Sequence, residues 1–139
     1  MSISKTKVKT PDGFELDVKT LTPGQEIKKT VIMSHGLTSS MDGRRGQLLK
    51  IAETLCSNGY KVIQYDFRGH GKSSGVDLDV SPNSLFTDLK TIVDNFVDGD
   101  YYLFGFSFGG FATCEYLYYT KKYFRKESCV DWATARSNQ

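Results

Sequence analysis

The chain has 139 residues, of which 39% are hydrophobic and 24% charged, shares that are typical of one packed domain and exclude a disordered or fibrous chain. Its 18 basic and 16 acidic residues give a formal net charge of +2, which excludes the strong positive field that supports binding to nucleic acid or an anionic membrane. Three cysteines without metal-ligand spacing, and an N-terminus without the apolar core of a signal peptide, predict free thiols, no bound metal and a cytoplasmic location.

The chain opens with signals for an antiparallel hairpin followed by a buried strand. Residues 3–10 and 14–18 show a side-chain period of two around a Pro-Asp-Gly turn, which predicts two paired strands. Residues 30–33, with the sequence TVIM, form a short continuous apolar run, which is typical of a strand covered on both faces. We therefore expect residues 30–33 to form a central strand.

Helices and strands are then expected in alternation, and no apolar run among them approaches the length of a membrane span. The expected elements are a helix over 44–57, a strand over 60–65, a helix over 82–97, a strand over 101–106 and a helix over 108–121. This alternation predicts an α/β fold with a doubly wound, mostly parallel sheet of about five strands and three main helices. Residues 1–139 are expected to form a single domain.

The most informative motif is Gly105-Phe106-Ser107-Phe108-Gly109, which matches G-x-S-x-G between a predicted strand and a predicted helix. A tight turn here leaves no room for side chains two positions either side of the serine, which explains the glycines. The helix start directs free N–H groups to the same point. Such a serine is suited to acyl transfer, in which Ser107 attacks a carbonyl carbon and the Phe108 N–H binds the oxyanion. The alternative is a glycine-rich turn that happens to contain a serine.

Two further motifs follow the neighbouring predicted strands. Ser34-His35-Gly36-Leu37 comes after the central strand, where Gly36 allows a close approach to the nucleophile and the Leu37 N–H is a candidate second oxyanion donor. Residues 66–75, with the sequence DFRGHGKSSG, come after the next strand. This stretch is similar to nucleotide-binding loops, but it lacks the glycine positions that phosphate-binding and dinucleotide-binding loops require. We therefore expect no nucleotide and no other cofactor.

Taken together, the three motifs resemble the α/β-hydrolase family, in particular the branch of monoacylglycerol lipases, cinnamoyl-type esterases and serine aminopeptidase-like hydrolases. HGL, DFRGHGKSSG and GFSFGG occur in the family's order within residues 3–120, and the tail at 121–139 stays unassigned. The resemblance implies a serine hydrolase that acts on small carboxylic esters with acyl or lipid-like groups. It also implies that Ser107 is the nucleophile, that Leu37 and Phe108 supply the oxyanion donors, and that the DFRGHGKSSG loop is structural and shapes the cleft.

The sequence departs from the family at the catalytic base and acid. The family needs a histidine that accepts the serine proton and a carboxylate that orients this histidine, both after the nucleophile in the chain. The only histidines, His35 and His70, precede Ser107. We expect His35 to support the oxyanion loop by hydrogen bonding, and His70 lies in a turn between glycines, so the role of base is the weaker interpretation of each. The sequence therefore predicts a truncated domain that holds the front half of the fold.

The tail leads to an expectation about the edge of the sheet. Residues 121–139 contain no apolar run able to form a further strand, so the strand at 101–106 is expected to be an exposed apolar edge that favours self-association. Two alternatives to an ester hydrolase stay open at this point. One is a catalytically inactive remnant or interaction module that keeps the serine turn as a folding feature. The other is a serine aminopeptidase-like hydrolase of the same family.

Overall fold

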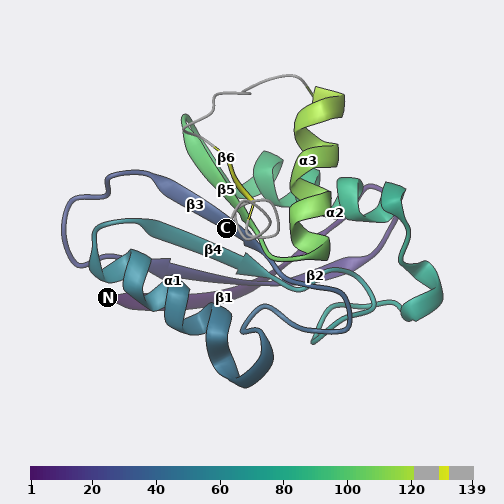
Figure 1. The fold of residues 1–139 in the computed structure, drawn as a ribbon, viewed down its shortest axis with the longest axis horizontal. Coiled ribbons are helices and arrows are strands. Elements are labelled where there is room, and N and C mark those ends of the chain that lie inside the picture. The colour runs from purple at the N-terminus through teal and green to yellow at the C-terminus, as the bar shows by residue number, and fades with distance from the viewer. Residues whose placement is uncertain (121–128, 132–139) are drawn as a thin grey trace, which may run out of the picture.

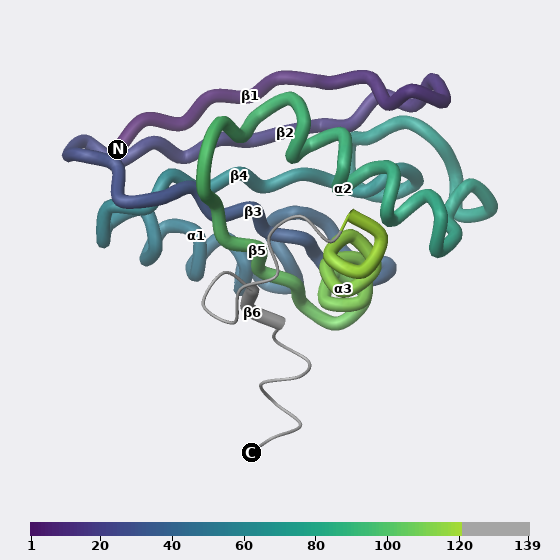
Figure 2. Tube along the Cα trace, turned by 90° about the horizontal axis from the view of Figure 1, so that it is seen from above, coloured from purple at the N-terminus to yellow at the C-terminus, as the bar shows by residue number. Residues whose placement is uncertain are grey.

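The computed structural model describes residues 1–120 and 129–131, which form one mixed sheet flanked by helices (Figure 1). The strands lie in the order β1-β2-β4-β3-β5-β6, which Figure 2 shows from β1 at the top to β6 at the bottom. β2 is antiparallel to β1 and β4, whereas β3 is parallel to β4 and β5. The strands are β1 (Ser2–Lys9), β2 (Glu15–Thr22), β3 (Thr30–Ser34), β4 (Lys61–Tyr65), β5 (Tyr101–Gly105) and β6 (Cys129–Asp131).

Three main helices cover the two faces of the sheet, and two short 3-10 turns precede α1 and α2. The helical elements are η1 (Arg44–Gly46), α1 (Gln47–Ser57), η2 (Asp77–Asp79), α2 (Pro82–Phe96) and α3 (Phe108–Thr120). α1 packs with Val31 and Val62 on one face, whereas α2 and α3 pack with Ile32 and Ile63 on the other. Successive residues of β3 and β4 therefore point into different cores, as continuous apolar runs predict. The expected α/β class, with an N-terminal antiparallel hairpin, is confirmed.

α2 begins where the sequence predicts. The Ser81 hydroxyl accepts a hydrogen bond from the Ser84 N–H at 3.1 Å, and the Ser84 hydroxyl accepts one from the Ser81 N–H at 2.8 Å. Pro82 occupies the first turn, where its missing N–H costs no hydrogen bond. This reciprocal cap fixes the first turn of α2 at one end of the sheet.

The short strand β6 corrects one expectation from the sequence. Five longer strands form as predicted, but Cys129–Asp131 adds a sixth, pairing in parallel with Leu103, Phe104 and Gly105. A three-residue strand is too short to be recognised from side-chain periodicity, because its pairing depends on backbone hydrogen bonds. The edge of β5 expected to be open is therefore covered along these three residues, which removes the argument for self-association there. The rest of the predicted tail, residues 121–128 and 132–139, lies outside the described residues.

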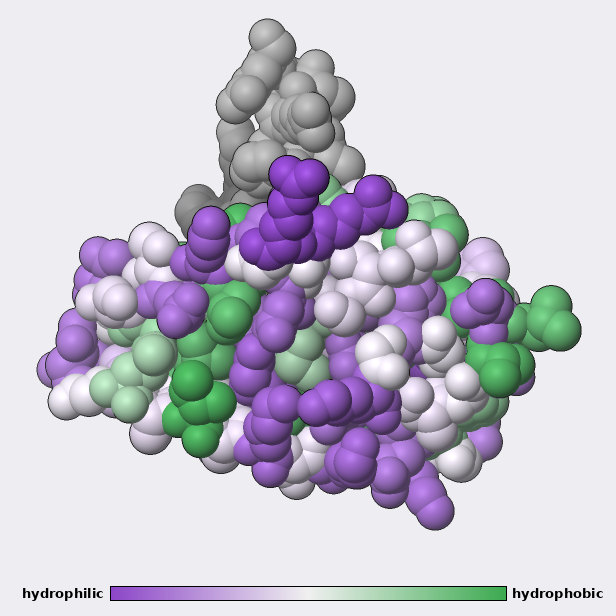
Figure 3. All heavy atoms as spheres, turned by 90° about the horizontal axis from the view of Figure 1, so that it is seen from below, coloured by the Kyte–Doolittle hydropathy of each residue, from purple (hydrophilic) through white to green (hydrophobic). Residues whose placement is uncertain are grey.

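The described surface carries neither a membrane-spanning helix nor a cluster of metal ligands. Figure 3 shows one face that is mainly hydrophilic, with hydrophobic side chains in separate patches. Among residues 1–120 and 129–131, no helix is long and apolar enough to cross a membrane. The same residues contain no group of three or more His, Cys, Asp or Glu side chains placed to hold a metal ion. Cys56 is a buried free thiol, and Cys114 is exposed.

Candidate active site

Ser107 lies in the turn that joins β5 to α3, at the carboxyl end of the parallel strands. Its side chain is exposed, and its φ of 56° lies in the left-handed region that side chains rarely adopt. Three backbone hydrogen bonds hold this conformation: the Phe106 N–H donates to Ser34 O at 3.0 Å, and the N–H groups of Gly110 and Phe111 donate to Ser107 O at 2.8 and 3.2 Å. The turn therefore presents a hydroxyl to solvent on a fixed and strained backbone.

The glycines on either side of Ser107 have a direct steric cause. A Cβ atom on Gly105 would lie 2.4 Å from Gly109 O, and one on Gly109 would lie 2.1 Å from Ser34 O. Both distances are far shorter than any real contact, so a side chain at either position would force β5, α3 and β3 apart. By contrast, a Cβ atom on Gly36 would lie 3.6 Å from the Ser107 Cβ, an ordinary contact. An alanine at position 36 would therefore fit without a clash, so the steric argument for glycine holds at Gly105 and Gly109 but not at Gly36.

The N–H groups of Leu37 and Phe108 are the two predicted oxyanion donors. Phe108 is the first residue of α3, and Leu37 follows Gly36 in the loop after β3. Within the described part of the chain, neither N–H donates a hydrogen bond to a protein acceptor. Both residues line one pocket of about 330 Å³, together with the apolar side chains of Val80 and Pro82. Leu37 and Phe108, which carry the two predicted oxyanion donors, thus line the same pocket, and Ser107 directly precedes Phe108 in the chain.

His35 is a buried support of the loop that carries Leu37. Its Nδ1 donates to Gly36 O at 2.7 Å, and its Nε2 accepts from the Phe67 N–H at 3.1 Å. Burial of the ring lowers the pKa of His35 from its usual 6.5 to about 4, because burial disfavours the charged imidazolium. Both ring nitrogens of this neutral histidine are occupied, so the geometry gives no support to His35 as the base for Ser107.

His70 is held in the same way. Its Nε2 accepts from the Thr38 N–H at 2.9 Å, and its Nδ1 donates to Arg68 O at 3.0 Å. His70 is 8% exposed, and the centre of its ring lies 5.1 Å from that of the His35 ring. With both nitrogens engaged, His70 also has no free atom to accept a proton from Ser107.

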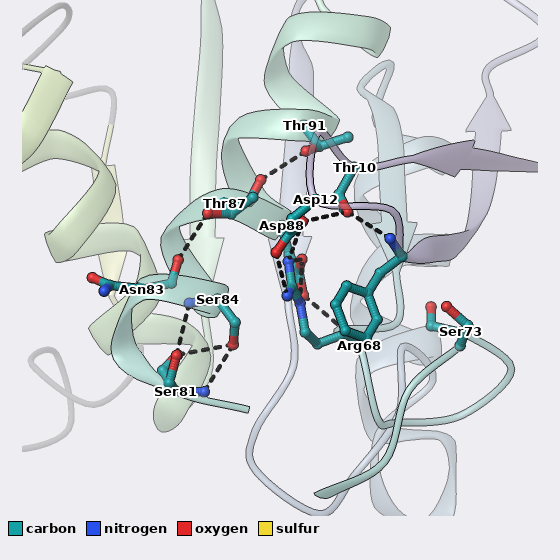
Figure 4. Close-up of polar contacts among 12 residues, drawn as sticks. Thr10, Asp12, Arg68, Ser73, Ser81, Asn83, Ser84, Thr87, Asp88 and Thr91 are labelled. Atoms are coloured by element: carbon teal, nitrogen blue, oxygen red, sulfur yellow. Dashed lines mark hydrogen bonds and ion pairs between the residues drawn. The ribbon is translucent and has the colours of Figure 1, made fainter. Parts of the chain in front are cut away.

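The DFRGHGKSSG loop is anchored by a buried arginine. Arg68 Nε and Nη2 donate to Asp88 Oδ1 at 3.0 and 2.8 Å, and Nη1 donates to Asp12 Oδ2 at 2.7 Å (Figure 4). The guanidinium also lies 4.1 Å from the centre of the Phe14 ring. Hydrogen bonding from Arg68 lowers the pKa of Asp12 from 3.8 to about 2. This cluster joins the β1–β2 turn, the loop after β4 and α2.

Asp66 anchors the start of this loop. Its two carboxylate oxygens accept from the backbone N–H groups of Met41 at 2.7 Å and Lys72 at 3.0 Å. A Cβ atom on Gly71 would lie 2.2 Å from Asp66 Oδ2, so this position must be glycine for the loop to close on the carboxylate. The loop after β4 is thus attached to the loop after β3 at Met41 as well as at Thr38.

Sequence reasoning missed two residues that shape this site. Asp88 lies on the face of α2 that also carries Leu85, Leu89 and Ile92, and an acid on an apolar helical face is a signal for a buried ion pair. Thr38 adopts a φ of 63° in the turn that carries Leu37. No sequence signal indicates this conformation, because β-branched residues disfavour it.

The fold and the serine turn together define the class of protein. A mostly parallel sheet that presents an exposed serine between a strand and a helix is the architecture of an α/β hydrolase. Residues 25–130 match the family model described as serine aminopeptidase, S33, and the chain belongs to this family of α/β hydrolases. The resemblance inferred from the three motifs is therefore confirmed.

Individual relatives include enzymes named as esterases. The chain is 36% identical over 117 residues to caffeoylshikimate esterase from Arabidopsis thaliana, covering 79% of this chain and 34% of that protein. A crystal structure of a putative hydrolase from Agrobacterium vitis superposes with a TM-score of 0.78 at 22% identity, over 94% of this chain and 50% of that one. The Pyrococcus furiosus esterase Pf2001 gives 0.73 at 30% identity, over 87% and 48%. The chain thus spans about a third to a half of these relatives.

Proposed function

We propose that this chain carries the nucleophile and the oxyanion hole of a serine hydrolase that acts on carboxylic esters. The proposal is supported by the exposed Ser107 in a left-handed turn and by the N–H groups of Phe108, the next residue, and of Leu37, which lines the same pocket as Phe108. Neither N–H donates a hydrogen bond within the described residues. A hydroxyl with two such donors is the arrangement that acyl transfer requires. The membership of the S33 family and the esterases among its relatives support a hydrolase.

In the proposed reaction the Ser107 hydroxyl attacks the ester carbonyl carbon and gives up its proton to a base. Negative charge then develops on the carbonyl oxygen, where the N–H groups of Leu37 and Phe108 stabilise it. The alcohol leaves with a proton from the conjugate acid of that base, and water hydrolyses the acyl-serine. The pocket of about 330 Å³ beside these groups would receive part of the substrate.

Neither His35 nor His70 is placed to serve as the base in this reaction. Each has both ring nitrogens engaged by backbone groups, and the sequence holds no other histidine. We propose that the histidine and its carboxylate come from polypeptide outside these 139 residues. The chain alone should then combine an intact serine turn with very slow turnover, because a neutral hydroxyl is a weak nucleophile.

For the substrate we propose an ester with a planar or lipid-like acyl group. The apolar part of the pocket, formed by Leu37, Val80, Pro82 and Phe108, suits a hydrocarbon portion, and the relative named caffeoylshikimate esterase suggests hydroxycinnamoyl esters as the first compounds to examine. An aminopeptidase activity, which the family description names, is the second candidate within the same site.

The test supplies the missing base from solution. The chain is incubated with a fluorophosphonate probe, with and without imidazole, and the adduct on the peptide that contains Ser107 is measured by mass spectrometry. We expect slow labelling that imidazole accelerates, because neutral imidazole can accept the hydroxyl proton while the oxyanion hole stabilises the phosphorus-bound oxygen. Hydrolysis of p-nitrophenyl and hydroxycinnamoyl esters would follow under the same conditions.

Ser107→Ala is the matched control, because it removes the hydroxyl and leaves the turn. Imidazole-dependent labelling in the unaltered chain and none in the variant supports the proposal. A chain that folds but gives no Ser107 adduct with imidazole would contradict it, and would favour a folding or interaction role for the serine turn.

A further inference from the structure

The turn that carries Leu37 has an unusual backbone. The Ser39 N–H donates to Gly36 O at 3.2 Å and closes a four-residue turn, with Leu37 and Thr38 at its centre. Thr38 has a φ of 63°, which turns of this type normally reserve for glycine or asparagine. A β-branched residue in this conformation needs an external contact to hold it there.

Two histidines hold the two peptide groups that flank Leu37. His35 Nδ1 donates to Gly36 O at 2.7 Å, and since a peptide group is planar and trans, this bond also sets the direction of the Leu37 N–H. His70 Nε2 accepts from the Thr38 N–H at 2.9 Å, which fixes the next peptide group. The backbone of Leu37 is therefore clamped on both sides.

His70 is itself held in place by hydrogen bonds that lead through Arg68 to α2. Its Nδ1 donates to Arg68 O at 3.0 Å, and the Arg68 N–H donates to Asp88 Oδ2 at 2.9 Å. Asp88 lies on α2 and is fully buried. The imidazole is thus fixed by α2 through Arg68, and its only remaining nitrogen points to the Thr38 N–H.

We propose that His70 is a positioning residue for the oxyanion hole. By accepting from the Thr38 N–H, it keeps the Leu37–Thr38 peptide from flipping, holds Thr38 in the left-handed region and so keeps the Leu37 N–H beside Ser107. This inference rests on the proposed function, because it assigns the histidine of the DFRGHGKSSG loop to the same reaction. His70 acts on the oxyanion hole through Thr38, and it also lines the pocket of about 330 Å³ that would receive part of the substrate.

The test compares two substitutions that differ in one property. His70→Phe keeps a ring beside His35 and Phe67 but removes the acceptor, whereas His70→Gln keeps an acceptor for the Thr38 N–H. Lys90→Ala, on an exposed site of α2, is the control. In the unaltered chain labelled with ¹⁵N, a trans-hydrogen-bond coupling between the Thr38 nitrogen and His70 Nε2 is expected. Its absence in a well-resolved spectrum would overturn the proposal before any substitution is made.

The first readout is amide exchange of Ser39, whose N–H closes the turn. We expect His70→Phe to accelerate this exchange by about tenfold or more relative to the Ile32 amide in β3, because Thr38 can then leave its strained conformation. His70→Gln and Lys90→Ala should leave the exchange rate of Ser39 close to that of the unaltered chain. A Ser39 amide that stays protected in a folded His70→Phe chain would show that the turn does not need His70, and would overturn the proposal.

The second readout is imidazole-assisted labelling of Ser107. Loss of one oxyanion donor lowers the rate of acyl transfer by about a hundredfold or more, and a misplaced donor should lower the maximal labelling rate by about tenfold. His70→Gln should recover the rate. Because His70 also lines the pocket, a loss that came only from the pocket lining would instead change the probe concentration that gives half the maximal rate. A normal labelling rate in His70→Phe contradicts the proposal. If the unaltered chain gives no adduct, the proposed function fails, and the exchange of Ser39 still decides whether His70 positions the turn.

Discussion

At the scale of single residues, Ser107 combines a chemical role with a backbone cost. Its φ of 56° places a residue with a Cβ atom in a conformation that costs roughly 1–2 kcal/mol relative to the right-handed one. Hydrogen bonds to Ser34 O and from Gly110 and Phe111 hold the turn against this cost. The strain belongs to the backbone, so removing the hydroxyl alone does not relieve it.

Because the strain lies in the backbone, glycine and alanine should differ in stability at position 107, and in the opposite direction at a helical position. Ser107→Gly should raise the free energy of unfolding by about 1 kcal/mol relative to Ser107→Ala, because only glycine adopts positive φ without a clash. Urea denaturation measures this quantity. At Glu53, which is exposed within α1, the same comparison should change sign, because glycine weakens a helix by about 1 kcal/mol relative to alanine. Equal stabilities of the two Ser107 variants would show that the turn is not strained.

A second residue-scale prediction concerns His35 and acid. Its pKa is lowered from 6.5 to about 4 by burial, so between these values the unfolded chain binds a proton that the folded chain does not. The contribution of neutral His35 to the free energy of unfolding is therefore complete above pH 6.5, and it declines as the pH falls toward 4. The largest loss is roughly 3 kcal/mol, at 1.4 kcal/mol per pKa unit. Urea midpoints measured across this range should show the decline.

His35→Gln should flatten that pH dependence, although the variant starts from a lower stability. Asp12→Asn serves as a comparison, because the pKa of Asp12 is lowered from 3.8 to about 2, and its contribution is lost only as the pH falls through that lower range. An unchanged slope above pH 4 in the His35→Gln chain would mean that another group causes the acid sensitivity.

At the scale of elements, the Arg68 cluster connects parts that are distant in the sequence. Arg68 follows β4, Asp12 lies between β1 and β2, and Asp88 lies on α2. Arg68 and Asp88 are both buried, so removal of Arg68 would leave the Asp88 carboxylate without its ion-pair partner, and removal of Asp88 would leave Arg68 paired with Asp12 alone. The positions of α2 and of the loop that carries His70 therefore depend on each other.

We expect Asp88→Leu to lower the free energy of unfolding by about 3 kcal/mol, because the Arg68 guanidinium then loses its buried partner. The double variant Arg68→Met, Asp88→Leu should lose much less than the sum of the two single changes, which a double-mutant cycle in urea measures. The exposed pair of Lys90 and Asp94 on α2 is the matched control, with an expected coupling below about 0.5 kcal/mol. Additive effects at Arg68 and Asp88 would mean that the two side chains are not coupled.

Elements with strong local signals were predictable from the sequence, and those that depend on tertiary pairing were not. The expected helix over 82–97 matches α2 at Pro82–Phe96, because a capping serine and a proline mark its start. The strand expected at 14–18 extends to Thr22. Residues beyond the region of alternating apolar and polar side chains also pair with β1 and β4, and this pairing lengthens the strand. The bond between Thr38 and His70 joins loops 32 residues apart, and no local pattern indicates it.

At the scale of the whole molecule, the strand order explains why three separate motifs meet. β3 lies between β4 and β5 and is parallel to both, so the loops that follow these strands all emerge at one edge of the sheet. This edge is where open α/β sheets bind ligands. The order of strands could not be read from any one motif. The alternation of helices and strands predicted a mostly parallel sheet, and the family resemblance assigned the loop with Leu37 to the oxyanion hole and the DFRGHGKSSG loop to the cleft.

The pairing of β6 with β5 gives a final prediction, for amide exchange. In a strand with one neighbour, only alternate N–H groups are protected, because successive N–H groups point to opposite sides. With β3 on one side and β6 on the other, the consecutive amides of Leu103, Phe104 and Gly105 should all exchange slowly. A second copy of the chain paired to this edge would give the same pattern, but its protection would fall on dilution. Protection of every amide that persists on dilution supports β6, whereas alternating protection would mean that this edge of β5 is open.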